Sequence, residues 1–112
     1  IQEQGCAALL SLTYQHKVNQ NAVAKAKGVE AIVAGMKTHL KASAMCQRNG
    51  CGALVNLSSG NLDNKKAIVS ADGIAVILTA MKTYPKNANV HREACSVLFN
   101  LCQSPHRKLV EK

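Results

Sequence analysis

Apolar side chains recur along this chain at the spacing of one face of an α-helix. One stripe occupies positions i, i+3, i+4 and i+7 and consists of Val29, Ile32, Val33 and Met36. The same stripe returns 45 residues later as Ile74, Ile77, Leu78 and Met81. This spacing is typical of an amphipathic helix with a single buried face. We therefore predict two medium-length helices whose four apolar positions point into the core.

The repetition extends beyond these stripes. Residues 5–12 (GCAALLSL) return as residues 50–57 (GCGALVNL) and again as residues 94–101 (ACSVLFNL). The segment 27–38 likewise matches the segment 72–83. A period of about 44–45 residues filled with helical patterning indicates a solenoid of stacked helices.

Each repeat is expected to contain a short, a medium and a long helix. Gly28 and Gly73 are expected to end the short helices, because glycine accepts the left-handed conformation of a helix stop. Pro85 blocks continuation of the second medium helix. The short helix of the first repeat is predicted at 18–25, and the long helices at roughly 44–57 and 89–101.

The period also divides the chain. We predict one array over residues 1–112, and both of its ends should expose apolar stacking surface. Its parts are the last helix of a preceding repeat at 1–14, repeats at 15–59 and 60–104, and a tail or the start of a further repeat at 105–112.

In type, order and spacing, these blocks resemble the armadillo repeat. The resemblance rests on the block 50–58 (GCGALVNLS), Asn64, the triplet 67–69 (AIV) and the block 71–74 (ADGI). It covers about residues 1–104 and implies an all-α, armadillo-type, right-handed superhelix with three helices per repeat. HEAT repeats are the nearest alternative, but their units usually have two helices, and the breaks at Gly28 and Gly73 favour three.

The resemblance also implies a function. Armadillo domains bind other proteins, often an extended peptide in a groove lined by their third helices, where an Asn hydrogen-bonds the peptide backbone in many members. Asn56 and Asn100 match that Asn by position, and Ser11 stands at the first such position. Helical geometry places further polar or small residues on the same face. The small ones, Gly52 among them, are expected to let a partner backbone approach. The predicted groove comprises Asn56, Asn100, Asn49, Glu93, Ser96, Gly52, Ser11 and Gln4, with Arg48 and Arg92 at its edge.

Two alternatives to a peptide groove remain at this point. The asparagines could merely cap or solvate their helices, or the repeats could form a structural spacer that associates through its open ends, including as a homodimer. If the groove does bind a peptide, exchanging Asn56 and Asn100 for alanine is expected to leave the fold intact and to weaken partner binding by about 1–3 kcal/mol. Import receptors of the importin-α type carry a Trp four residues before the Asn, where this chain has Ala7, Gly52 and Ser96, so recognition of nuclear signals is not expected.

Charge adds a second candidate surface. The formal net charge is +8, and three pairs of basic residues share columns of the repeat: Lys37 with Lys82, Lys41 with Lys86, and Arg48 with Arg92. Such columns form ridges suited to an acidic partner segment or an anionic surface. Alternatively, the lysines complement helix dipoles and keep the surface soluble. Aromatic residues are only 3% of the chain, which disfavours a nucleic-acid interface.

Nothing in the sequence predicts catalysis, a cofactor or a metal site. The histidines and acidic residues are scattered, and no second cysteine pair stands at a metal-binding spacing. Three of the five cysteines lie in one column, about one repeat apart, so we expect small, buried thiols that stay reduced in the cytoplasm, with the nucleus also compatible. The apolar stretch 74–81 is too short to cross a membrane. We therefore predict a non-enzymatic protein-binding scaffold.

Overall fold

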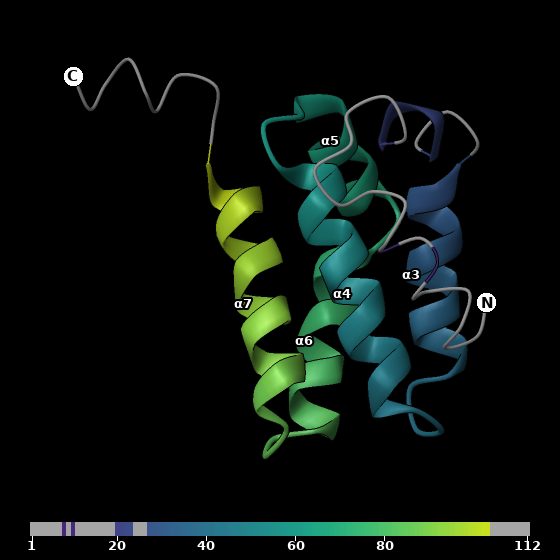
Figure 1. The fold of residues 1–112 in the computed structure, drawn as a ribbon, viewed down its shortest axis with the longest axis vertical. Helices are drawn as coiled ribbons and strands as arrows, with labels where there is room; N and C mark the ends of the chain where they lie inside the picture. The colour runs from purple at the N-terminus through teal and green to yellow at the C-terminus, as the bar shows by residue number, and fades with distance from the viewer. Residues whose placement is uncertain (1–7, 9, 11–19, 24–26, 104–112) are drawn as a thin grey trace.

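The computed structural model describes residues 8, 10, 20–23 and 27–103, and this part of the chain is helical with no strand (Figure 1). The helices are α3 (Gly28–Thr38), α4 (Ala44–Ser58), α5 (Leu62–Ser70), α6 (Gly73–Thr83) and α7 (Ala88–Cys102). The predicted order of short, medium and long helix is confirmed by α5, α6 and α7. The expected helices at 1–14 and 18–25 fall mainly on residues outside the described ones.

The helices form two layers. The long helices α4 and α7 lie side by side and share the most extensive contact between any two of the helices (Figure 1). The helices α3, α5 and α6 form the second layer: α3 and α5 contact α4, and α6 contacts α7. Because α3 also contacts α5 and α6 of the next unit, each repeat buries its apolar face against its neighbour. This arrangement is an α-solenoid of the predicted type.

The predicted stripe of α3 is confirmed. Its four apolar side chains are all buried, with exposed fractions between 0% and 4%: Val29, Ile32, Val33 and Met36. They join a core cluster that includes Cys51, Leu54 and Leu57 of α4 and Ile68 of α5. The side chain of Met36 also fills the space beside Gly50, where an added Cβ would lie 2.5 Å from Met36 Cγ.

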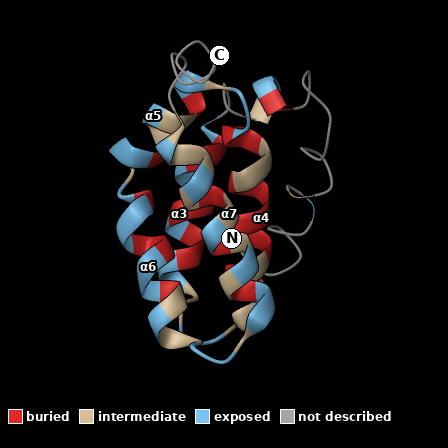
Figure 2. Ribbon diagram, turned by 90° about the vertical axis from the view of Figure 1, so that its left-hand side faces the viewer, coloured by how far each residue is buried: buried red, intermediate tan, exposed pale blue. Residues whose placement is uncertain are grey.

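The predicted stripe of α6 is only partly right. Ile77 is buried, whereas Ile74 and Leu78 are 39% and 43% exposed. Val76 and Ala80 are buried in their place, so α6 keeps its buried positions along one side (Figure 2). In α3 the positions equivalent to Ile74 and Leu78 are covered by α5 and α6 of the following repeat. Within the described residues no further helix covers that side of α6, and the two side chains stay exposed.

The role predicted for Gly28 and Gly73 is wrong, although the helix break itself is confirmed. The left-handed residues are the preceding Lys27 (φ 62°) and Asp72 (φ 66°). The glycines are required instead by close packing, because a Cβ on Gly73 would lie 2.5 Å from Ile68 Cγ2 and 2.6 Å from the Ile68 carbonyl oxygen. Glycine therefore lets α6 begin directly against the last turns of α5.

Polar side chains fix where three helices begin. The side-chain oxygens of Ser43, Asn61 and Asn87 accept hydrogen bonds from backbone N–H groups at the starts of α4, α5 and α7, over 2.9, 3.0 and 3.1 Å. These caps satisfy backbone donors that have no partner within their own helix. Pro85 directly follows Tyr84, the C-cap residue of α6. The helix thus ends before the proline, as the sequence predicted.

Candidate partner-binding face

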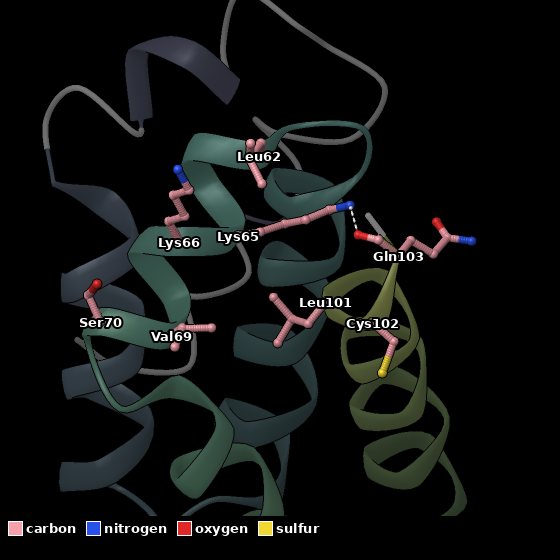
Figure 3. A pocket seen from close by; sticks show the side chains of 8 residues that line it. All are labelled: Leu62, Lys65, Lys66, Val69, Ser70, Leu101, Cys102 and Gln103. Carbon is pink, nitrogen blue, oxygen red and sulfur yellow. Dashed lines mark hydrogen bonds between the residues drawn. The ribbon is translucent and has the colours of Figure 1, made fainter. Parts of the chain in front are cut away.

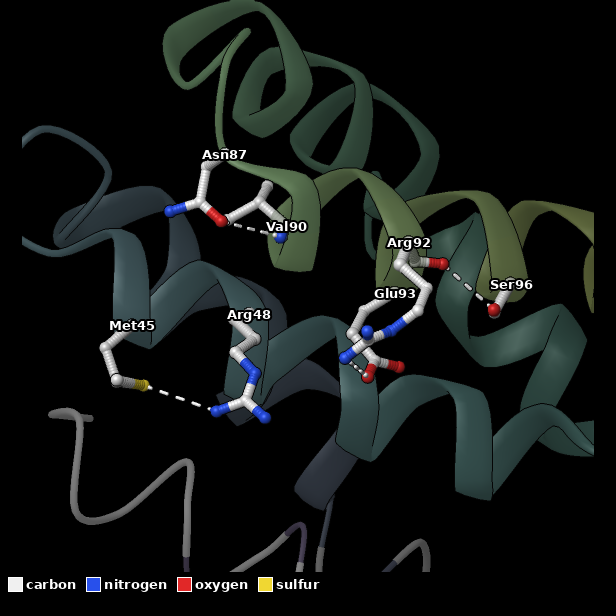
Figure 4. A network of polar contacts seen from close by, with 7 residues as sticks. All are labelled: Met45, Arg48, Asn87, Val90, Arg92, Glu93 and Ser96. Atoms are coloured by element: carbon white, nitrogen blue, oxygen red, sulfur yellow. Dashed lines mark hydrogen bonds and ion pairs between the residues drawn. The ribbon is translucent and has the colours of Figure 1, made fainter.

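The helices α4 and α7 carry the predicted groove residues that the structure describes. Figure 4 shows Arg48 on α4 and Arg92, Glu93 and Ser96 on α7. We call this surface the α4–α7 face. Ser11 and Gln4 lie outside the described residues. The remaining eight are Arg48, Asn49, Gly52 and Asn56 on α4 and Arg92, Glu93, Ser96 and Asn100 on α7.

The two asparagines of the repeat column each donate to a backbone carbonyl oxygen about one repeat earlier in the chain. Asn100 Nδ2 donates to the Val55 carbonyl oxygen over 3.2 Å and to Ser58 Oγ over 3.1 Å, so α7 is bound to α4. One repeat earlier, Asn56 Nδ2 donates to the Leu10 carbonyl oxygen over 3.3 Å. Neither the peptide-binding role nor the solvating role considered for these residues includes this contact. The amide N–H groups therefore have a structural function within the array.

Two of the predicted groove residues are buried by the protein itself. Asn49 is only 5% exposed. A Cβ on Gly52 would lie 3.0 Å from Leu10 Cδ1, so the space beside this glycine is taken by the Leu10 side chain. The sequence interpretation, in which Gly52 leaves room for a partner backbone, is thus corrected. The accessible part of the face lies mainly on α7, where Arg92 is exposed and Glu93, Ser96 and Asn100 are half-buried.

The charged side chains of the α4–α7 face make only weak contacts with their neighbours. Arg92 Nη2 lies 3.8 Å from Glu93 Oε2, and the two side chains are 62% and 25% exposed. An ion pair this long and this exposed to solvent contributes little to stability. Arg48 Nη1 lies 3.7 Å from Met45 Sδ, and Ser96 Oγ donates to the Arg92 carbonyl oxygen over 2.9 Å (Figure 4). Both arginines can therefore turn toward a bound molecule at small cost.

The family match follows the helices closely. Residues 61–103 match the Armadillo/beta-catenin-like repeat, a segment that runs from the cap of α5 to the cap of α7 and includes the three helices of one repeat. The segment 61–103 is thus a repeat of the armadillo type. The comparisons with curated proteins and with solved structures gave no match. Armadillo repeats generally mediate protein–protein interactions and are typically non-enzymatic scaffolds.

A depression at the end of the array lies between α5 and the last turn of α7 (Figure 3). It has a volume of about 440 Å³, and Lys65 Nζ donates across it to the Gln103 carbonyl oxygen over 3.0 Å. At the equivalent place on α4, Leu57 and Ser58 are fully buried, and Asn64 of α5 donates to the Leu57 carbonyl oxygen over 2.7 Å. The depression is lined by Leu62, Lys65, Lys66, Val69, Ser70, Leu101, Cys102 and Gln103.

The described residues contain no group of three or more His, Cys, Asp or Glu side chains that could hold a metal ion. Their four cysteines are thiols and form no disulfide: Cys46 and Cys51 are buried, whereas Cys95 and Cys102 are exposed. The exposure of the latter two differs from the buried thiols expected from the sequence, and Cys102 lines the depression at the array end. No helix in the described segments has the length and apolar character needed to span a membrane.

Replacing Asn100 by alanine is expected to lower the free energy of unfolding by about 1–2 kcal/mol, because it removes two hydrogen bonds that join α7 to α4. Chemical denaturation followed by circular dichroism measures this loss. Asn89→Ala is the control, since Asn89 is exposed on the first turn of the same helix. Equal stabilities of the two variants would show that the tie between the long helices is not formed. The variant is still expected to fold, as the sequence analysis predicts, but with lower stability.

Proposed function

We propose that this protein is a non-enzymatic scaffold that binds an extended segment of a partner protein along the α4–α7 face. The observation that carries the proposal is the arrangement of Asn100. Its Nδ2 is engaged within the array, while its Oδ1 accepts no hydrogen bond from the described residues. An amide oxygen held in place in this way can accept a hydrogen bond from the backbone N–H of a partner.

The surroundings of Asn100 fit an extended backbone. Ser96 stands one helical turn away and is small, so a chain can approach the helix there. Arg92 follows one further turn away with a largely exposed guanidinium, and Glu93 beside it supplies a carboxylate. A partner backbone would thus meet an acceptor, a small side chain and a pair of charged groups in order along α7. The guanidinium of Arg92 and the carboxylate of Glu93 would fix the direction of the partner chain.

The thiols support a location in a reducing compartment. Cys46 and Cys51 are buried without a disulfide, and Cys95 and Cys102 are exposed as free cysteines. Exposed thiols persist in the cytoplasm or nucleus because the redox systems there keep them reduced. We infer that the scaffold acts in the cytoplasm, with the nucleus also compatible.

Ser96→Arg is expected to abolish or strongly weaken partner binding by placing a long side chain across the α4–α7 face. Thr79→Arg is a matched control on α6. Both hydroxyls donate to the carbonyl oxygen four residues earlier, over 2.9 Å from Ser96 and 2.8 Å from Thr79. The two substitutions therefore remove the same kind of hydrogen bond and add the same charge. Immobilised wild-type and variant chains are compared for proteins retained from cell extract, after thermal unfolding confirms that both variants fold.

The proposal requires a set of proteins retained by the wild type and by Thr79→Arg but lost with Ser96→Arg. Retention of the same proteins by all three chains would contradict it, since the α4–α7 face would then be dispensable. Recovery of no protein beyond the chain itself would also count against a partner-binding scaffold. Proteins lost equally with both variants would indicate an effect of added charge and not of this face.

A further inference from the structure

The loops that join the medium helices to the long ones form a continuous edge of the molecule. We call it the loop edge and define it as residues 37–43 and 82–87. Both loops lie at the same end of the helices (Figure 1). The Tyr84 hydroxyl donates a hydrogen bond to the Leu40 carbonyl oxygen, so the loops of successive repeats are in contact. Within each loop, backbone N–H groups of Ser43 and Asn87 donate to the carbonyl oxygens of His39 and Tyr84.

The loop edge is basic and has no acidic residue nearby in the chain. Its four lysines, Lys37, Lys41, Lys82 and Lys86, are all exposed. No Asp or Glu occurs in residues 31–62 or in residues 73–92. The first turns of α4 and α7, which begin at this edge, also contain no acidic residue. Among the described side chains, none of these four lysines forms an ion pair.

Two of the four lysines have a role within their own helices, and the other two do not. Lys37 and Lys82 lie in the last turns of α3 and α6, where a cation complements the helix dipole. Lys41 and Lys86 lie in the loops, beyond the helix ends, and occupy the same place in successive repeats. A dipole contribution therefore does not explain them. Together, the four charges produce a positive potential that spans two repeats.

We propose that the loop edge is a second binding surface, separate from the α4–α7 face, which takes an Asp- and Glu-rich segment of a protein. The lysine side chains are long and flexible, so the surface recognises the density of negative charge more than one sequence. Such attraction raises the rate of encounter and adds affinity at low ionic strength. A partner that binds the α4–α7 face could thus first be captured at the loop edge, through an acidic stretch of its own chain.

The chemistry of the edge favours an acidic protein segment over other polyanions. Base stacking requires exposed aromatic rings, and the two aromatic rings of the loop edge, His39 and Tyr84, are both half-buried, with the Tyr84 hydroxyl engaged. Binding to an anionic membrane is strengthened by apolar side chains that insert among the lipids. The exposed large apolar side chains of the described residues all lie outside the loop edge.

The position of the edge separates it from the apolar surface at the array end. Ile74 and Leu78 are exposed where a stacked repeat would cover them, as their counterparts in α3 are covered. The loop edge runs along the side of the stack, because the loops of successive repeats lie next to one another. Repeats stacked on either end would therefore extend the edge and leave it accessible.

The test compares two double variants that remove the same charge. Lys41→Gln/Lys86→Gln neutralises the loops, and Lys27→Gln/Lys66→Gln neutralises two exposed lysines outside the loop edge, one at the N-cap of α3 and one in the middle of α5. Binding of a fluorescent oligoglutamate peptide to the full chain is measured by anisotropy at low salt and at physiological ionic strength. An oligoglutamine peptide, a single-stranded oligothymidylate and phosphatidylserine vesicles are measured in parallel. Amide chemical-shift changes on adding oligoglutamate locate the contact.

We expect oligoglutamate to bind, oligoglutamine not to bind, and the loop variant to lose at least about fivefold in affinity at low salt. For the Lys27→Gln/Lys66→Gln variant, the factor by which affinity falls should be less than half of that for the loop variant. The amide chemical-shift changes should centre on residues 39–43 and 84–87. Equal losses in both variants would overturn the proposal, because net charge alone would then account for binding. Tighter binding of the oligonucleotide or the vesicles, or no binding of oligoglutamate, would also overturn it.

Discussion

Replacing Leu54 by alanine is expected to lower the free energy of unfolding by about 2–5 kcal/mol. Leu54 has no exposed surface and belongs to the core cluster in which α4 meets α3, α5 and α7. Removing most of its side chain takes away apolar contacts on both layers and leaves a cavity that the backbone cannot close. Because each repeat is stabilised chiefly by its neighbours, the loss should affect the whole described array.

Denaturant titration followed by circular dichroism measures this effect. Leu62→Ala is the matched control, because it removes the same atoms from a side chain that is 44% exposed at the start of α5. The control is expected to change the free energy of unfolding by less than about 1 kcal/mol. Similar losses in the two variants would contradict a two-layer core centred on α4.

Gly73→Ala is expected to destabilise the protein by about 1–3 kcal/mol through overpacking. The added Cβ would meet Ile68 at 2.5 Å from Cγ2 and 2.6 Å from the carbonyl oxygen. The side chain of Ile68 is fully buried and the oxygen belongs to the backbone, so neither can move aside without disturbing the core. The start of α6 would have to shift away from α5.

Asp72→Gly separates this packing effect from a conformational one. Asp72 has φ 66°, a left-handed conformation that glycine adopts more readily. We therefore expect the Asp72→Gly variant to be at least as stable as the wild type in the same denaturant titration. If Asp72→Gly were destabilising and Gly73→Asn were tolerated, the left-handed position would be residue 73, and the packing explanation for Gly73 would fail.

Much of the fold could be predicted from the sequence because the chain repeats. The helical spacing of Val29, Ile32, Val33 and Met36 defines a buried face without any knowledge of the neighbours. The equivalent spacing in α6 gave the wrong answer for Ile74 and Leu78, because burial depends on which helix lies above them. A periodic pattern shows which residues are equivalent, but it does not show which copy is covered. The same limit applies to Gly73, whose need for space arises from Ile68.

The candidate site was less accessible to sequence reasoning. The period placed Asn56 and Asn100 at equivalent positions, but nothing in the pattern indicated that each donates to a backbone carbonyl oxygen 45 or 46 residues earlier in the chain. Leu10 beside Gly52 was missed for the same reason. The pattern did contain an Asn that recurs next to a recurring apolar position. That pattern is compatible with a hydrogen bond between repeats as well as with a hydrogen bond to a ligand.

The most direct test of the scaffold proposal is amide hydrogen exchange of the chain alone and with the partner recovered by the wild type. The account predicts slower exchange in the partner complex along α7, centred on the turns that carry Arg92, Ser96 and Asn100, and along the facing part of α4. Exchange on the outer side of α6, around Thr79, should stay unchanged. Protection confined to α3 and α6, with α7 exchanging at the rate of the free chain, would contradict binding at the α4–α7 face.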